Sequence, residues 1–372
     1  MISPAPPRNL ASVLVTSGVA KVTEGRGEDH PPRNFFKRTK NMRIEAFSEG
    51  KNLDDPDANE DQLLILPGRG YAVIDGVTDR TGHRYDGMLA GRMAGLVVRD
   101  ATAAFLLDPA NRDLDPVKLV AHVSAAIQAA YARFEIAEIA RTQPERRFGA
   151  TLALAAECGE VLRVVLVGDS GVRFDGKETI RVDPGLDLVT AGIRLAAWKF
   201  LEAAGAGHAT RVAVSRACVF HGLAELRPEM RPWLDAAALA ALRAGYLAEA
   251  AERFPEVPAA DVETLIDGGI IRGQGRFQNK TASPLGYCVL DGFAVPMSLV
   301  RVFDRPKAGL RTIELFTDGY FASGSEPGID AWETAFAQIE RVDPDKLNAY
   351  PSVKGTIGRV RADDRTVVIV TF

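Results

Sequence analysis

NEDQLLILPGRGYAVIDGV, the stretch at residues 59–77, contains two short apolar runs, 62–66 and 71–74, on either side of the turn sequence PGRG. Two strand-length apolar runs around a turn that contains Pro and Gly predict a β-hairpin. If Leu66 pairs with Tyr71, Asp75 lies opposite Gln62, and Asp61 lies opposite Gly76. The hairpin therefore gathers acidic side chains at its open end, where their mutual repulsion is unfavourable unless solvent or a cation lies between them.

Further aspartates stand at the ends of other strand-like runs. Asp169 follows the run at 162–167, Asp318 follows 313–316, and Asp363 with Asp364 precedes 366–372. Turn chemistry explains any one of them, because Asp-Gly is a common turn pair. Their recurrence favours a shared carboxylate site. Oxygen ligands without a His or Cys cluster suit Mg²⁺ or Mn²⁺ better than Zn²⁺.

These acids belong to an ordered set of short motifs. The motifs are Asn-Glu-Asp at 59–61, Ala-Val-Ile-Asp-Gly at 72–76, Gly-Ala-Thr at 149–151, Val-Gly-Asp-Ser at 167–170, Leu-Phe-Thr-Asp-Gly at 315–319 and Asp-Asp-Arg-Thr-Val-Val at 363–368. The set resembles the PPM (PP2C-type) family of metal-dependent protein serine/threonine phosphatases, in its bacterial form. The resemblance covers 59–189 and 311–372.

The resemblance implies an α+β fold, an αββα four-layer sandwich of two antiparallel sheets flanked by helix pairs. It also implies two Mn²⁺ or Mg²⁺ ions, with a weaker third position. The residues that it assigns to metal binding are Asp75 as the bridging ligand, Asp318 and Asp363 on the first ion, Glu60 and the Gly76 carbonyl on the second, Asp61 through a coordinated water, and Asp169 with Asp318 at the third. Asp75 and Asp318 would act in catalysis through the metal-bridging water, which attacks a phosphomonoester in line.

Two positions depart from the family pattern. Pro56 stands where the family has a phosphate-binding Arg. The candidate replacements for binding substrate are Lys51, Arg43 or a residue of the insertion, although Lys lacks the two-pronged guanidinium. Asp364 stands where Asn is usual. The string Val-Ser-Arg-Ala at 214–217 is similar to another family motif, but we interpret it as coincidence because its usual continuation is missing.

Composition and charge restrict the remaining possibilities. The 372 residues carry 45 Lys plus Arg against 49 Asp plus Glu, a net charge of −4 that gives no indication of nucleic-acid binding. No apolar run reaches the roughly 20 residues of a membrane span. Three scattered cysteines and no secretion signal favour the cytoplasm.

The chain divides into a tail, a main domain and an insertion. Residues 1–41 are rich in proline and carry a net +4, so we expect a disordered basic tail or a misassigned start. Residues 42–372 are expected to form one phosphatase-type domain, interrupted by a helical insertion at about 191–296.

Three functions are compatible with these features. The first is a metal-dependent phosphomonoester hydrolase whose partner is a phosphoprotein, dephosphorylated at serine or threonine. The second keeps the metal chemistry but acts on a small phosphate ester. The third is a pseudophosphatase that binds without turnover, although none of the metal-binding acids is lost.

Overall fold

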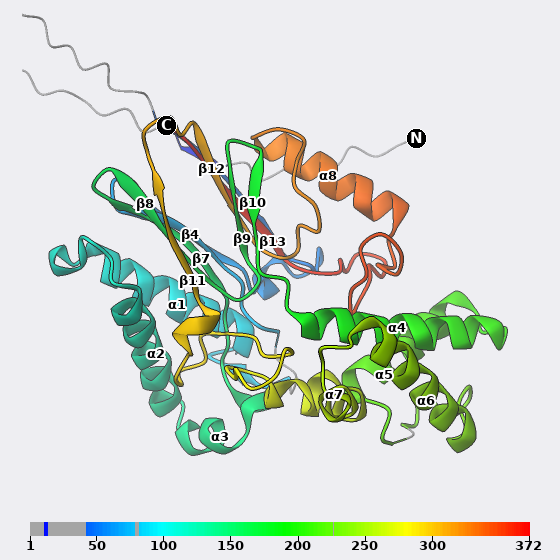
Figure 1. The fold of residues 1–372 in the computed structure, drawn as a ribbon. Helices are drawn as coiled ribbons and strands as arrows, with labels where there is room; N and C mark the ends of the chain where they lie inside the picture. Colours follow the sequence, from blue (N-terminus) through cyan, green and yellow to red (C-terminus); the bar gives the residue numbers. More distant parts are fainter. Residues whose placement is uncertain (1–10, 14–41, 79–81, 226) are drawn as a thin grey trace, which may run out of the picture.

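Two antiparallel sheets form the centre of the structure, a computed structural model that describes residues 11–13, 42–78, 82–225 and 227–372 (Figure 1). The larger sheet has six strands. Their order is β1 (Ala11–Val13), β2 (Arg43–Glu49), β13 (Arg365–Thr371), β12 (Thr312–Phe316), β9 (Gly171–Phe174) and β10 (Glu178–Ile180). The second sheet has five strands, in the order β11 (Arg301–Pro306), β8 (Val161–Val167), β7 (Leu152–Cys158), β4 (Gly70–Ile74) and β3 (Gln62–Leu66).

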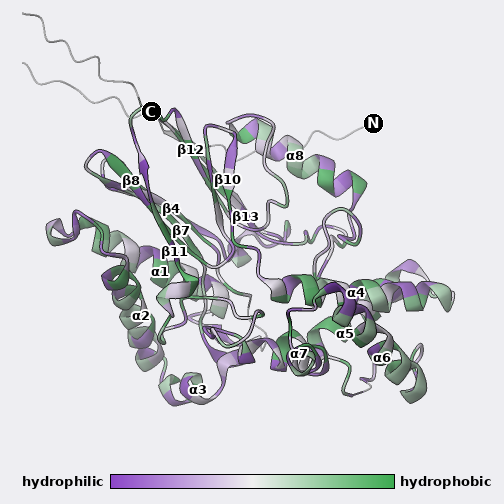
Figure 2. Ribbon diagram, viewed as in Figure 1, coloured by the Kyte–Doolittle hydropathy of each residue, from purple (hydrophilic) through white to green (hydrophobic). Residues whose placement is uncertain are grey.

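The central strands β4, β7, β8, β12 and β13 are apolar and buried along most of their length, whereas the edge strands β10 and β11 carry polar, exposed residues (Figure 2). In β4, Tyr71 and Val73 face the core between the two sheets, whereas Ala72 and Ile74 face the helices outside. Side chains alternate between the two faces of a strand, so a continuous apolar run is the pattern of a strand buried on both faces.

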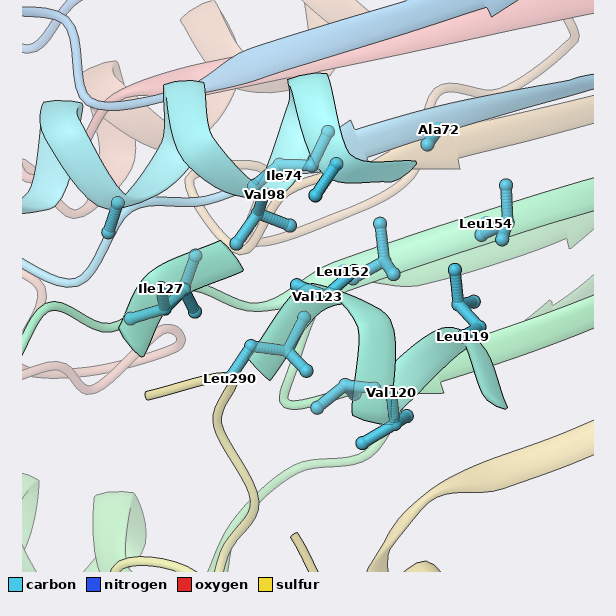
Figure 3. Packing of buried hydrophobic residues seen from close by; sticks show 14 of the residues in the cluster. Ala72, Ile74, Val98, Leu119, Val120, Val123, Ile127, Leu152, Leu154 and Leu290 are labelled. Atoms are coloured by element: carbon cyan, nitrogen blue, oxygen red, sulfur yellow. The ribbon is translucent and has the colours of Figure 1, made fainter. Parts of the chain in front are cut away.

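Helices complete the layers on the outer faces. The helices α1 (Ala90–Leu107) and α2 (Pro116–Arg133) pack on the five-stranded sheet, and Figure 3 shows Val98 and Val123 beside Ile74 and Leu152. The short α3 (Ala137–Thr142) follows α2. On the six-stranded sheet, α8 (Ile329–Val342) packs through Trp332 against Phe316. The α+β sandwich implied by the motifs is therefore confirmed.

Local sequence explains several element boundaries. Asp115 caps α2, because its carboxylate accepts hydrogen bonds from the backbone N–H groups of Val117 and Lys118, and Pro116 occupies the first turn. A small hairpin, β5 (Arg84–Tyr85) with β6 (Met88–Leu89), leads into α1.

No helix in the described part of the chain is long and apolar enough to cross a bilayer.

The register of the β3–β4 hairpin differs from the prediction by one residue. Leu66 pairs with Gly70 rather than with Tyr71, and Gln62 pairs with Ile74. Gly68 adopts a φ of 77°, a conformation that favours glycine, and the Arg69 N–H donates to the Leu66 carbonyl at 2.9 Å. This tighter turn removes one residue from the loop. The prediction that Asp61 lies opposite Gly76 was therefore wrong, and the observed register, extended by one residue, places Asp61 opposite Asp75.

A helical bundle interrupts the sandwich between β10 and β11. Its helices are α4 (Gly185–Ala203), α5 (His208–His221), α6 (Ala236–Arg253) and α7 (Ala259–Arg272). Residues from all four helices form a hydrophobic cluster that is separate from the cores of the sandwich. The bundle begins at Gly185, six residues before the predicted insertion start, and a segment without long elements leads from α7 to β11.

The predicted tail, residues 1–41, lies outside the described residues except for 11–13. Those three residues form β1, which pairs with β2 at the edge of the six-stranded sheet.

Candidate metal centre

Acidic residues from both sheets meet at one end of the sandwich. Asp75 follows β4, Asp169 follows β8, Asp318 follows β12, and Asp363 precedes β13. All four line one cavity of about 390 Å³, which also reaches the helical insertion. Strand ends that are far apart in sequence therefore supply acidic side chains to one cavity.

Asp61 is almost fully buried, with 3% of its surface exposed. One of its carboxylate oxygens accepts a hydrogen bond from the Thr317 hydroxyl at 2.7 Å, and that hydroxyl accepts a bond from the Thr366 N–H at 2.9 Å. Thr317 thus joins the ends of β12 and β13 to the start of β3. This contact orients Asp61 toward the other strand-end acids.

Gly76 and Glu60 lie against the first turn of α1. A Cβ atom at Gly76 would stand 2.1 Å from the Gly91 carbonyl oxygen, and a Cβ at Gly91 would stand 2.4 Å from a Glu60 carboxylate oxygen. Glycine at both positions is therefore a steric requirement. The Thr151 N–H donates to the Asp75 carbonyl at 2.8 Å and holds the backbone of the Asp75–Gly76 segment against Ala150.

Several carboxylate oxygens in this region are buried without a hydrogen-bond partner. They are one oxygen each of Glu60, Asp61, Asp169 and Asp318. An uncompensated buried acceptor is unfavourable, and an ionised one more so. Asp169 and Asp318 line the cavity, whereas the predicted ligands Glu60, Asp61 and Gly76 do not. Buried oxygens of this kind fit a cation, and the all-oxygen donor set fits Mg²⁺ or Mn²⁺.

The pKa values of these acids also indicate that too little positive charge surrounds them. Burial, followed by the charges of Asp318, Asp61, Asp363 and Asp169, raises the pKa of Asp75 well above its ordinary range. Burial and the carboxylates around them raise the pKa of Asp169 and of Asp318 to about 7. Asp363 differs, because Lys354 and Lys51 outweigh the effect of burial and lower its pKa. A divalent cation would allow the other three to ionise together.

The acidic side chains line the cavity but do not converge on one point. Within the described residues, no group of three or more His, Cys, Asp and Glu side chains is already assembled to hold a metal ion. Mg²⁺ in proteins often keeps several waters and takes only one or two carboxylates directly. The arrangement therefore fits hydrated ions and does not resemble a closed cage.

The structure places the two candidate phosphate-binding residues differently. Lys51 lines the cavity, and its Nζ donates to Glu60 at 2.6 Å and to Asp364 at 2.9 Å. Although burial lowers the pKa of Lys51, the carboxylates around it raise that pKa above its ordinary value. Arg43 does not line the cavity; it lies at the start of β2, forms an ion pair with Glu45 and has a largely exposed side chain.

Sequence reasoning missed several residues of this site. Lys354 lines the cavity and forms an ion pair with Asp363 at 3.0 Å, and Asp187, in the first turn of α4, lines it as well. Neither residue belongs to a motif, and long-range folding brings each one there. Arg216, from the string that we interpreted as coincidence, also lines the cavity.

Arg216 differs from the other positively charged residues of the cavity wall. Lys51, Lys354, Arg147 and Arg361 each form an ion pair with an acid. Among the described residues, Arg216 forms no ion pair, and its guanidinium lies 5.2 Å from the centre of the Phe220 ring. Within the part of the chain that the structure describes, Arg216 therefore gives this wall of the insertion a positive charge without an ion pair, beside an aromatic ring.

Comparisons with known proteins return solved structures only. No model of a protein family matches the chain, and the search of curated proteins found no match. The serine/threonine phosphatase PstP/Ppp of Mycobacterium tuberculosis is 21% identical, with a TM-score of 0.40, over 89% of this chain and 98% of that one. The serine/threonine phosphatase Stp1 of Staphylococcus aureus is 12% identical, with a TM-score of 0.42, over 94% and 99%.

A third similar structure is PppA of Pseudomonas aeruginosa, described as a key regulatory component of T6SS, at 14% identity and a TM-score of 0.40, over 89% of this chain and 97% of that one. The catalytic domain of PstP has also been solved in complex with two manganese ions. The first two are bacterial serine/threonine phosphatases, the class that the motif order resembles.

Proposed function

We propose that this chain is a metal-dependent phosphomonoester hydrolase that dephosphorylates phosphoserine and phosphothreonine in proteins. The observation that carries the proposal is the convergence of strand-end carboxylates, with unpartnered buried oxygens, on one cavity. Phosphoryl transfer needs neutralisation of negative charge and a positioned nucleophile more than it needs a covalent protein group.

In this proposal the acids hold two Mn²⁺ or Mg²⁺ ions in the roles that the motifs imply. Asp75 would contact both ions, Asp318 and Asp363 the first, and Glu60 with the Gly76 carbonyl the second. Asp61 would act through a water, and Asp169 with Asp318 would offer the weaker third position. Bound divalent cations would lower the pKa of water and neutralise phosphoryl charge.

The residues of the chain itself position these ligands and the substrate. Thr317 holds Asp61, and Lys354 holds Asp363, so two of the carboxylates have defined orientations. The insertion contributes Phe220, Ile270 and Arg216 to the lining of the cavity, and Arg216 forms no ion pair among the described residues. We infer that this wall contacts the part of the substrate that surrounds the phosphate.

We also propose that residues 42–372 form one catalytic domain around the helical insertion, preceded by a basic tail, and that the protein works in the cytoplasm. All three cysteines, Cys158, Cys218 and Cys288, are free, as expected in a reducing compartment.

The deciding experiment is Mn²⁺-stimulated hydrolysis of 4-nitrophenyl phosphate by the wild type and by Asp75→Asn. We expect hydrolysis that requires Mn²⁺ or Mg²⁺ and falls by at least about 100-fold in the variant, since charge stabilisation of this kind is worth that much. Asp100→Asn, an exposed change on α1, is the matched control and should keep full activity.

Phosphopeptides and small phosphate esters are then compared as substrates. Higher kcat/KM for small esters would replace the protein-phosphatase assignment by a small-molecule phosphatase. Metal binding by a folded wild type without any turnover would instead indicate a pseudophosphatase.

A further inference from the structure

Lys51 enters the acidic site directly after β2 and is held there at two points. Its backbone N–H donates to one Asp364 oxygen at 2.6 Å, and its Nζ donates to the other at 2.9 Å. Asp364 therefore binds both ends of the residue. Only 17% of the Lys51 side chain is exposed.

The three protons of the Lys51 ammonium group have three acceptors. Besides Asp364, these are a Glu60 oxygen at 2.6 Å and the Thr78 hydroxyl oxygen at 2.9 Å. The Thr78 hydroxyl in turn donates to the same Glu60 oxygen at 2.8 Å. An ammonium group has only three donors. With all three engaged, none remains for a substrate phosphate.

The contacts make Lys51 the counter-ion of the Glu60 side of the site. Glu60 is fully buried, and Lys51 is the only positively charged group that forms an ion pair with it in the described part of the chain. A buried carboxylate without a partner is strongly unfavourable. Asp169 and Asp318, by contrast, form no ion pair among the described residues. One oxygen of each lacks a hydrogen bond, as does one oxygen of Glu60, and the Lys51 Nζ also lies 3.5 Å from an Asp363 oxygen.

We propose that Lys51 competes with a divalent cation for Glu60, so that the ammonium group neutralises Glu60 and Asp364 until metal displaces it. The inference rests on the proposed metal-dependent function and adds to it the order in which the two metal ions bind. The first ion enters beside Asp75 and Asp318, because no positively charged side chain among the described residues forms an ion pair with them and one Asp318 oxygen lacks a hydrogen-bond partner. The ion assigned to Glu60 enters only at higher concentration, because it must displace a resident positive charge.

Equilibrium binding of Mn²⁺, followed through the electron paramagnetic resonance of free Mn²⁺, tests this order without any activity measurement. We expect wild type to show one tighter and one weaker class of site. Lys51→Met should tighten the weaker class by about tenfold or more, which corresponds to roughly 1.4 kcal/mol or more. Lys51→Arg, which keeps the charge, should retain the weaker class.

Two further variants keep the test decisive. Lys118→Met removes an exposed lysine on α2 and should leave the isotherm unchanged. If Lys51→Met alone folds poorly because Glu60 loses its partner, Lys51→Met with Glu60→Gln removes both charges. That double variant should fold and should lack the weaker site.

The outcomes separate the two proposals. Identical isotherms for Lys51→Met and wild type, or two equal sites in wild type, would overturn the role of Lys51 while leaving the hydrolase intact. Absence of Mn²⁺ binding from wild type and from Lys51→Met alike would overturn both.

Discussion

Charge is distributed unevenly among the acidic side chains at the end of the sandwich. Glu60 and Asp364 share the ammonium group of Lys51, which also lies 3.5 Å from an Asp363 oxygen, and Asp363 pairs with Lys354 as well. Asp318, by contrast, forms no ion pair among the described residues and has a buried oxygen without a hydrogen-bond partner. At the scale of single residues, a cation beside Asp75 and Asp318 would therefore displace no resident positive charge.

A substitution at Gly91 tests the site at the scale of a single residue without altering any charge. A Cβ there would stand 2.4 Å from a Glu60 oxygen and 2.6 Å from the Val77 carbonyl, so Gly91→Ala must displace one of them. We expect a loss of about 1–3 kcal/mol in the free energy of unfolding, typical of overpacking, together with weaker Mn²⁺ binding. Urea unfolding and metal titration measure the two effects.

Gly245→Ala is the control for this prediction. Gly245 lies in α6 with no atom within 4 Å of the position of a Cβ, so alanine should stabilise the helix by about 0.5–1 kcal/mol. Equal stability of Gly91→Ala and wild type would show that the contact of Gly91 with Glu60 is unimportant.

At the scale of elements, α5 and α7 of the insertion build the wall of the cavity that faces the acids. Arg216 and Phe220 come from α5, and Ile270 comes from α7. Ile357 and Val360, a bridged pair in the segment before β13, line the cavity too, and both are more than 40% exposed. A positive charge among apolar side chains suits an anionic group attached to an apolar body.

Arg216→Ala tests this wall. Because Arg216 forms no ion pair among the described residues, we expect its loss to raise KM for a phosphopeptide by about tenfold, while kcat changes little. Arg253→Ala is the matched control. That arginine also belongs to the insertion and also lies 5.2 Å from the centre of a phenylalanine ring, Phe254, but it does not line the cavity. Equal KM values for both variants would show that Arg216 does not contribute to substrate recognition.

The same elements show what the sequence could and could not predict. Local patterns predicted the strands, the acids at their ends and the helical insertion, whereas the sandwich was predicted from the resemblance of the motifs to the PPM family. The β3–β4 register depended on the backbone conformation of Gly68, which a count of loop residues does not reveal. Lys354 and Asp187 reach the cavity through long-range packing, for which the sequence has no local signal.

At the scale of the whole molecule, the acidic site joins the two sheets. Asp61, Asp75 and Asp169 adjoin strands of the five-stranded sheet, whereas Asp318 and Asp363 adjoin strands of the six-stranded sheet. Repulsion among them acts across the core between the sheets. A bound cation would therefore stabilise the packing of one sheet on the other.

The stability of the metal-free protein should consequently depend on pH. An aspartate in the unfolded chain has a pKa near 4, whereas the pKa of Asp169 and of Asp318 in the folded protein is about 7. Between about pH 4 and pH 7 the folded state binds more protons than the unfolded state, so these groups make stability fall as pH rises. Thermal unfolding in EDTA should show a lower Tm at pH 8 than at pH 5.5.

Mn²⁺ should reverse this trend at pH 8. A ligand at 100 times its Kd stabilises the folded state by about 2.7 kcal/mol, enough to raise Tm by several degrees. Asp318→Asn should reduce both the pH dependence in EDTA and the gain from Mn²⁺. A Tm in EDTA that is higher at pH 8 than at pH 5.5, for wild type and variant alike, would contradict the proposed repulsion.

The insertion connects one sheet to the other. The chain leaves the six-stranded sheet at Ile180, at the end of β10, and joins the five-stranded sheet at Arg301, the first residue of β11, with α4–α7 and their separate hydrophobic cluster in between. Mutations in that bundle can accumulate without touching the hydrogen-bonded ladders of either sheet. Over evolutionary time, such a chain can change which molecules it admits while it inherits the same arrangement of acidic residues at the strand ends.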